Sequence, residues 1–427
     1  MPDTSRKSYA DLFRTPEFTP LFLSSSAGIA AQTVSGLALG TLVFRATDSP
    51  LLSAVSMFGP ALAQVLGATL FLSGADRLAP RATLAGLSLA FAVATAALAL
   101  PGLPLWAMFA IVLAEGLIAS LGGGVRWGLL NEILTEGGKS DDGKSDEGKR
   151  AGDKSGYMTG RSLFNMMSGV MQITGYAAGG ALLTLLSPRL CLLLAACLYG
   201  TAAGLTLRLT RRPPRAFGRP SVAATRRTNA LLWSSAPRRH VYLALWIPNG
   251  LVVGCESLYV SYDPGAAGIL FACAALGMLA GDVAVGRLLP ARLRPRLGIP
   301  LLMLLAAPYL VLFLRPPLPL TAVLVALASV GFAASLVQQE RLVALTPDEL
   351  AGHALGLHSA GMLTAQGVAA ALAGTVAQYS SPATAMTVMA AGSLTVTLTL
   401  TVASRRSAAD GGLWAARTGP RSRPRLG

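Results

Sequence analysis

The chain has 427 residues, of which 53% are hydrophobic and only 13% are charged, against about 25% charged residues in soluble domains. This composition excludes a disordered chain and argues against a soluble globular protein, because so few charges cannot cover the surface of a chain this long. The charges also cluster: residues 126–161, 208–239 and 405–427 hold thirty of them, and long runs between these segments hold none. This pattern is typical of an all-α membrane protein with many spans.

Twelve transmembrane helices are predicted along the chain. A helix crosses the hydrocarbon core in about 20 residues, and the two longest uncharged runs are broken by the turn signals Pro101-Gly102-Leu103-Pro104 and Ser380-Ser381-Pro382. The predicted spans are 20–44, 51–73, 82–100, 104–126, 162–186, 189–207, 240–262, 264–286, 297–314, 318–338, 354–378 and 382–403.

The basic residues predict the orientation. With the N-terminus inside, the inner segments carry 32 Lys and Arg, and the outer segments carry only Arg45, Arg189 and Arg315. Positive charge concentrates on the cytoplasmic side of membrane proteins. We therefore expect a multi-pass protein of the cell membrane with both termini in the cytoplasm, and the net charge of +15 does not require a nucleic-acid partner.

The charge clusters also predict the domains. We expect a six-helix bundle over 1–207, a basic cytoplasmic linker over 208–239, a second six-helix bundle over 240–404 and a basic cytoplasmic tail over 405–427. Each basic residue of such a linker gains about 1 kcal/mol at a surface of anionic headgroups, so the lipid bilayer is an expected partner. The repetitive, charge-balanced segment 136–155 is expected to be a disordered loop.

A weak internal repeat relates the two bundles. GADRLAPR starts at Gly74, GDVAVGRLLPARLR starts at Gly281, and Asp76 and Asp282 lie 206 residues apart, about half the chain. Each sequence stands at the inner end of the second span of its bundle. Folds built from two repeats place the binding site between them, near the membrane midplane.

At these residues the chain resembles the major facilitator superfamily. Asp76, Arg77 and Arg81 match the signature G-x-x-x-D-R-x-G-R-K/R between spans two and three, with Leu72 in place of the first Gly and Ala79-Pro80 in place of Gly-Arg. In span five, the run from Gly175 to Gly180 is similar to the G-P-x-x-G-G of proton-coupled exporters, with Tyr176 in place of Pro. The resemblance implies two pseudo-symmetric bundles, alternating access, and a cavity lined by spans one, four, seven and ten.

Two groups of these residues have expected roles in the conformational change. Asp76 can accept hydrogen bonds from a helix N-terminus and pair with an Arg, which suggests a latch that breaks in one state. The latch residues are Asp76, Arg77, Arg81, Asp282 and Arg287; alternatively, they mark topology. Gly175, Gly179 and Gly180 predict close helix packing at a gate.

Two acidic residues fall inside predicted spans: Glu115 at the centre of span four and Glu256 in the outer half of span seven. An intramembrane carboxyl is a functional hypothesis by default, and both suit proton coupling. Gln32 and Asn249 add polar groups to the expected cavity, and an apolar body of the substrate would rest on Trp246, Tyr259 and Met108. The alternative is a neutral interhelical hydrogen bond, which contributes about 0.6 kcal/mol on average.

The remaining patterns argue against an enzyme. Residues 138–145 satisfy the phosphate-loop pattern, but no strand precedes them and Asp141 and Asp142 would repel phosphate. The cysteines lack metal-ligand spacing, so no cofactor or metal is expected. We predict a secondary transporter, most simply a proton-coupled exporter of a small, partly hydrophobic compound. An importer or uniporter of a small solute, or a lipid-modifying membrane enzyme, remain alternatives.

Overall fold

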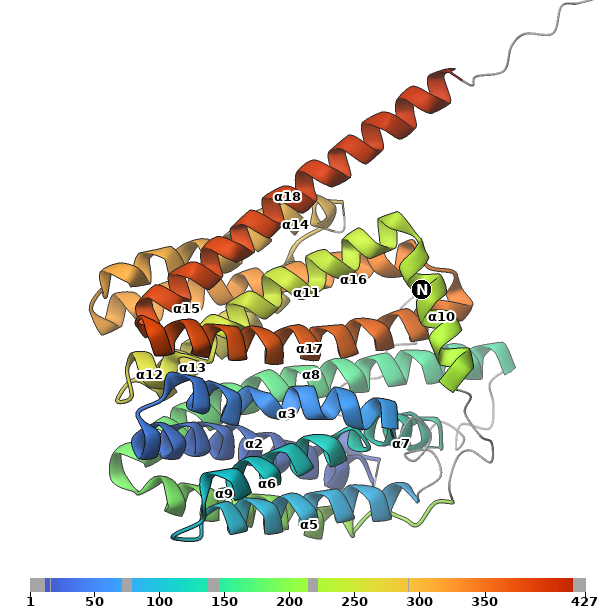
Figure 1. Ribbon diagram of the computed structural model, residues 1–427. Helices are drawn as coiled ribbons and strands as arrows, with labels where there is room; N and C mark the ends of the chain where they lie inside the picture. Colours follow the sequence, from blue (N-terminus) through green and yellow to red (C-terminus); the bar gives the residue numbers. More distant parts are fainter. Residues whose placement is uncertain are drawn as a thin grey trace, which may run out of the picture.

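The protein is described by a computed structural model that covers residues 12–15, 17–70, 79–136, 146–213, 222–290 and 292–417. Within these ranges every regular element is a helix, and most of the helices run roughly parallel or antiparallel to one another (Figure 1).

The first half of the chain, up to Thr206, forms seven of the described helices. They are α2 (Phe18–Thr47), α3 (Pro50–Leu70), α5 (Pro80–Leu98), α6 (Leu105–Ala119), α7 (Gly122–Glu136), α8 (Asp146–Leu185) and α9 (Pro188–Thr206).

Helix α10 (Val222–Ser234) follows, and the second half of the chain begins at Ala236. Its elements are α11 (Ala236–Glu256), α12 (Tyr259–Tyr262), α13 (Ala267–Val283), η1 (Ala284–Leu288), α14 (Arg294–Ala306), η2 (Ala307–Leu314), α15 (Leu318–Val330), η3 (Gly331–Ala333), α16 (Ala334–Ala344), α17 (Asp348–Tyr379) and α18 (Pro382–Arg417).

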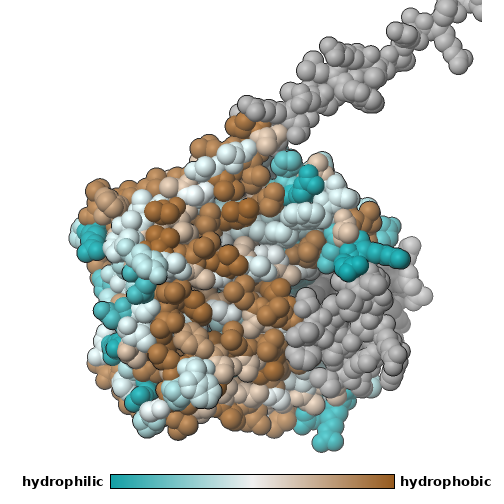
Figure 2. Space-filling model, in the orientation of Figure 1, coloured by the Kyte–Doolittle hydropathy of each residue, from teal (hydrophilic) through white to brown (hydrophobic). Residues whose placement is uncertain are grey.

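Ten helical segments of the described chain are long and apolar enough to cross a membrane, and α6 is a shorter apolar helix. Their outer surface is also apolar: Trp106, Val93 and Val323 expose 75%, 63% and 62% of their surface. Hydrophobic side chains cover much of the middle of the face in Figure 2, and hydrophilic ones gather toward its left and right edges. This surface matches a lipid environment and supports a multi-pass membrane protein.

Two segments differ from the sequence prediction. The fourth predicted span does not end at residue 126, because α7 continues the path of α6 to Glu136 after a break at Ser120 and Leu121. The segment 136–155 is not a disordered loop throughout, since α8 already begins at Asp146. Good helix formers such as Glu147, Lys149 and Ala151 explain this early start.

The helix bundle has two distinct ends. We call the end with the short connections 48–49, 186–187, 263–266 and 380–381 the hairpin end, and the opposite end, where α7 stops and α10 lies, the linker end. The two halves of the chain pack against each other mainly through α8 on α13 and α3 on α17. The arrangement therefore places two helix pairs along the boundary between the halves.

The linker is attached to both halves at the linker end. On the first half, Glu17 accepts a 2.7 Å hydrogen bond from the Thr210 amide, and it forms an ion pair with Arg212 at 2.7 Å. Burial by itself would raise the pKa of the Glu17 carboxyl, but these contacts with Thr210 and Arg212 outweigh it and hold the pKa below its ordinary value. On the second half, the ring of Trp233 in α10 stacks on Trp246 at 5.6 Å.

Candidate functional site

The most unusual polar group of the described residues is Glu256, the last residue of α11. Its side chain is 5% exposed, and its Oε1 atom has no hydrogen-bond partner. A buried carboxylate without donors is expensive, and the C-terminal end of a helix disfavours negative charge further. The arrangement therefore suits a carboxyl group that holds a proton.

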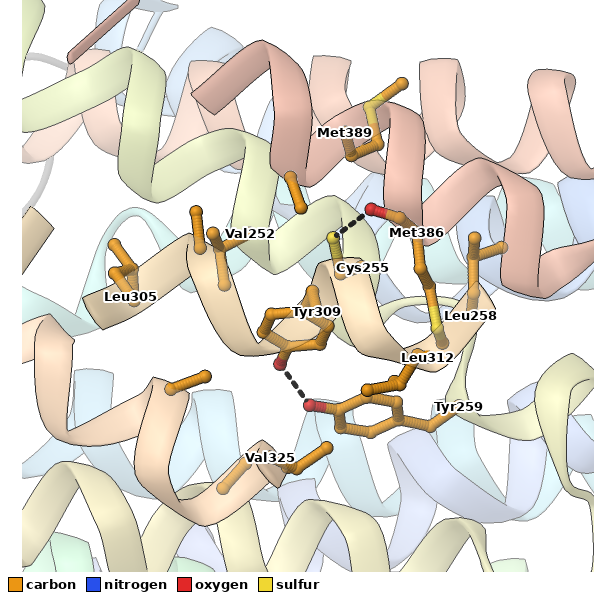
Figure 3. Packing of buried hydrophobic residues seen from close by; sticks show 14 of the residues in the cluster. Val252, Cys255, Leu258, Tyr259, Leu305, Tyr309, Leu312, Val325, Met386 and Met389 are labelled. Carbon is orange, nitrogen blue, oxygen red and sulfur yellow. Dashed lines mark hydrogen bonds between the residues drawn. The ribbon is translucent and has the colours of Figure 1, made fainter. Parts of the chain in front are cut away.

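Tyrosines surround this carboxyl. It interacts electrostatically with the hydroxyls of Tyr259, Tyr309 and Tyr176. Tyr259 and Tyr309 are hydrogen-bonded to each other through their hydroxyls (Figure 3). Tyr176 belongs to α8 and stacks on Phe271 of α13 at 4.8 Å. Glu256 thus lies where the two halves of the chain meet.

Asn249 shares this face of α11. It lies seven residues before Glu256, which is two helical turns, and it is 2% exposed. No hydrogen bond to its side-chain amide is found in the described part of the chain. Pro248 and Gly250 beside it do pack closely, because Ser393 donates to the Pro248 carbonyl and Gly250 lies against Ala365.

Glu115 and Gln32 form a second polar region within the first half of the chain. Thr95 of α5 donates a 3.3 Å hydrogen bond to Glu115 Oε1. Tyr199 of α9 interacts with both Glu115 and Ser35, and Ser35 donates to the Gln32 carbonyl. The Gln32 side chain is exposed, and its face of α2 is open, since a Cβ at Gly28 or Gly36 would meet nothing within 4 Å.

The predicted cavity residues therefore fall into two pairs. Gln32 and Glu115 share one region, Asn249 and Glu256 share another, and no described hydrogen bond or ion pair joins the pairs. The predicted apolar contacts are partly wrong. Met108 is buried in a core of the first half, and Tyr259 is fully buried and bonded to Tyr309, so neither is free to touch a substrate.

The glycines of α8 do pack against neighbouring helices. Gly175 faces Thr33 of α2, and a Cβ on Gly179 would make an ordinary 3.6 Å contact with Val34. A Cβ on Gly180 would lie 2.7 Å from the Cα of Gly268 in α13, closer than real Cβ atoms approach. The backbones of α8 and α13 therefore touch at this one point near the hairpin end.

The predicted latch residues are only partly visible. Asp76 and Arg77 lie outside the described residues, and Arg81 lies in the first turn of α5 with a half-buried side chain. Asp282 and Arg287 are exposed at the linker end of α13 and η1. An ion pair near them joins Arg294 to Glu340 at 3.0 Å.

The sequence prediction missed several polar residues near these regions. Thr95 donates a hydrogen bond to Glu115, Tyr199 interacts electrostatically with Glu115, and Tyr309 interacts electrostatically with Glu256. Gln172 of α8 and Gln366 of α17 are half-buried amides inside hydrophobic helices. A signal for the two glutamines was present, because an amide inside an uncharged run is as conspicuous as Gln32.

No protein-family model and no curated protein matches the chain. Solved structures do match its fold over almost the full length. The nucleoside transporter NupG is 12% identical with a TM-score of 0.69, covering 90% of this chain and 98% of that one. A POT family transporter in complex with 5-aminolevulinic acid is 10% identical with a TM-score of 0.69, covering 94% and 98%.

A third similar structure is a bacterial homolog of the human lysosomal transporter Spinster in an inward-facing, unoccupied conformation. It is 13% identical with a TM-score of 0.65, covering 93% of this chain and 96% of that chain. All three are transporters and none is an enzyme. Identities this low establish that the chain shares a fold with these transporters and nothing more.

Proposed function

We propose that this protein is a secondary transporter with twelve spans in two six-helix bundles, which works by alternating access. The observation that carries the proposal is the likeness to solved transporters over at least 90% of the chain. The bundles correspond to residues 1–207 and 240–404, joined by the basic linker 208–239 and followed by the tail 405–427.

The linker end is the cytoplasmic end in this proposal, because it carries the basic segments. The protein then sits in the cell membrane with both termini inside. Arg226 and Arg227 of α10 are exposed, which favours contact between the linker and anionic headgroups.

Proton-coupled export of a small, partly hydrophobic compound is the function that these features support best. Glu256 is buried without a donor on Oε1 and interacts electrostatically with Tyr176 of the opposite half, so a change in its protonation changes the interaction between the halves. Glu115 is a second proton site, within the first half, and accepts a hydrogen bond from Thr95. A proton at either site shifts the balance between the two open states, because it binds them unequally.

The glycines and the latch complete the cycle. Gly180 lets the halves approach at the hairpin end, and Gly175 and Gly179 pack α8 on α2 within the first half. Asp282 and Arg287, with Asp76, Arg77 and Arg81, close the linker end in the other state. The described contacts between halves, such as Gly180 on Gly268 and the 2.7 Å hydrogen bond from Ser49 to Gln378, correspond to a closed hairpin end.

Transport driven by a pH gradient in liposomes tests the proton sites. We expect Glu256→Gln and Glu115→Gln each to abolish coupled transport while exchange without net proton movement continues, since Gln mimics the protonated carboxyl. The proton assignment is wrong if both variants keep full coupled transport. Accumulation in whole cells with and without a protonophore separates export from the alternative of an importer or uniporter.

A further inference from the structure

The starting observation is the amide of Asn249, which is 2% exposed and lacks a partner within the described chain. A polar side chain in the interior normally pairs with the protein or with water. A packing role does not explain the amide, because an apolar side chain would fill the position without needing such a partner. The amide is therefore a candidate group for binding a ligand.

The neighbours of α11 fix the direction in which Asn249 lies. Gly250 and Gly254 face α17, and the Cys255 thiol donates to the Met386 carbonyl of α18. Asn249 and Glu256 occupy the remaining side. Since Glu256 interacts with Tyr176 of α8, this side of α11 faces the first half of the chain.

Two more amides lie on the α8 strip that ends at Tyr176. Gln172 precedes Tyr176 by one turn, and Asn165 precedes it by three turns, so the three share a face. This strip runs between the contacts of α8 with α13 and its contacts with α2. Gln172 is half-buried and Asn165 is exposed, and neither side chain is hydrogen-bonded within the described chain.

A fourth amide comes from α17. Gly367 packs on Leu62 of α3, and Ala365, on a different side of α17, packs on Gly250 of α11. Gln366 lies between these two contacts and opposite the exposed residues Thr364 and Thr375, so it points toward the centre of the molecule. Its amide also lacks a hydrogen bond within the described chain.

We infer that Asn249, Gln172, Gln366 and Asn165 line a substrate site for a neutral solute that carries several hydroxyl or amide groups, such as a polyol, a sugar or a nucleoside. Each amide offers donors and an acceptor without a charge. Residues 165–176 of α8 include no acidic or basic side chain, and residues 249–256 of α11 include only Glu256. The inference rests on the proposed transport function and names its substrate class.

Such a site discriminates by hydrogen bonding. A solute with matching groups replaces the water at the amides with hydrogen bonds of its own, whereas a solute that lacks them displaces the water and leaves the amides unpaired. A zwitterionic or cationic solute would need fixed charges of opposite sign. The four amides supply none, and the buried Glu256 suits a carboxyl group that holds a proton.

The test uses the purified full-length protein, with thermal stability in detergent as the binding readout and uptake into liposomes as the transport readout. The probes are uridine, glucose and glycerol as neutral solutes, dialanine as a zwitterion and tetraphenylphosphonium as a cation. We expect at least one neutral probe to raise the melting temperature and to be transported, and dialanine and tetraphenylphosphonium to do neither. Stabilisation by the charged probes alone, or by no probe, overturns the inference.

Variants separate a binding amide from a structural one. Asn249→Leu is expected to weaken binding of the neutral probe about tenfold or more, without lowering the melting temperature of the ligand-free protein, because the amide holds no hydrogen bond within the described chain. Gln366→Leu and Gln172→Leu should also weaken binding, and Thr364→Val on the opposite face of α17 should not. A lower ligand-free melting temperature for Asn249→Leu with binding intact overturns the inference.

The same data distinguish the two hypotheses. Suppose that the wild type binds a neutral probe, that Asn249→Leu abolishes this binding, and that no probe is transported. This result contradicts the proposed function and supports the site. Transport of dialanine or tetraphenylphosphonium alone contradicts the site and supports the proposed function.

Discussion

At the scale of single residues, one ion pair has a clear structural task. Glu17 stands just before α2, while Thr210 and Arg212 follow α9, so these contacts join the two ends of the first half of the chain. Arg212 also lies 4.0 Å from Glu132 of α7. Three segments far apart in the sequence thus meet at one guanidinium group.

Removing this carboxylate should destabilise the protein in a pH-dependent way. We expect Glu17→Gln to lower stability by about 1 to 2 kcal/mol at neutral pH, because charge-assisted hydrogen bonds to Arg212 and Thr210 are weakened. The folded-state pKa of Glu17 is lowered, so the greater stability of the wild type over Glu17→Gln is fully present above the carboxyl's unfolded-state pKa. This difference in stability is lost as the pH falls through the folded-state pKa.

Thermal unfolding in detergent across a pH series measures this effect. Glu349→Gln is a suitable control, because Glu349 is an exposed acid in the first turn of α17 at the same end of the bundle. Equal melting temperatures for Glu17→Gln and wild type at neutral pH would show that the contact contributes nothing.

At the scale of helices, the contact of α8 with α13 decides whether the hairpin end can close. Tyr176 stacks on Phe271, and one turn farther on Gly180 meets Gly268 with no room for a side chain. The adjacent residue along α8, Gly179, faces Val34 at an ordinary distance of 3.6 Å for an added Cβ. Neighbouring glycines in one motif therefore have different tolerance to a methyl group.

Gly180→Ala should hold the hairpin end open, whereas Gly179→Ala should be nearly neutral. Overpacking costs about 1 to 3 kcal/mol, so we expect the closed population, and with it the transport rate, to fall about tenfold. Liposome transport measures the rate, and thiol labelling of a cysteine at Ser49 measures access to the hairpin end. Equal transport rates of Gly180→Ala and Gly179→Ala would contradict the proposed role of the contact between Gly180 and Gly268.

At the scale of the whole molecule, alternating access requires the halves to separate at the hairpin end. Ser49 of the first half donates to Gln378 of the second half at 2.7 Å, so these positions meet when this end is closed. In a protein whose native cysteines are replaced, we expect a short reducible cross-linker between Ser49→Cys and Gln378→Cys to stop transport. Reduction should restore it.

The single-cysteine variants treated with the same reagent are the controls. Full transport by the cross-linked double variant would mean that the hairpin end does not open during the cycle, which contradicts alternating access. This result would not contradict the proposed binding site. Asn249 lies two turns from Glu256 toward the linker end, away from the cross-linked hairpin end.

The sequence by itself determined the hydrophobic helices, because each one is a local run that must satisfy its own backbone hydrogen bonds in lipid. The ten long apolar segments found in the structure lie at predicted spans, and the sequence predicts Glu256 within one of them and Glu115 within the shorter apolar helix α6. Helix ends were less predictable. The early start of α8 and the continuation of α6 into α7 depend on polar residues that helices and loops both accommodate.

Only the tertiary structure decided which polar side chains meet. Glu256 interacts electrostatically with Tyr176, although 80 residues separate them in the sequence. Glu115 accepts a hydrogen bond from Thr95 and interacts electrostatically with Tyr199. The rotation of each helix in the bundle sets these contacts, and it follows from how small residues such as Gly180 and Gly268 fit together. Hydropathy is an average over a helix and carries no information about that rotation.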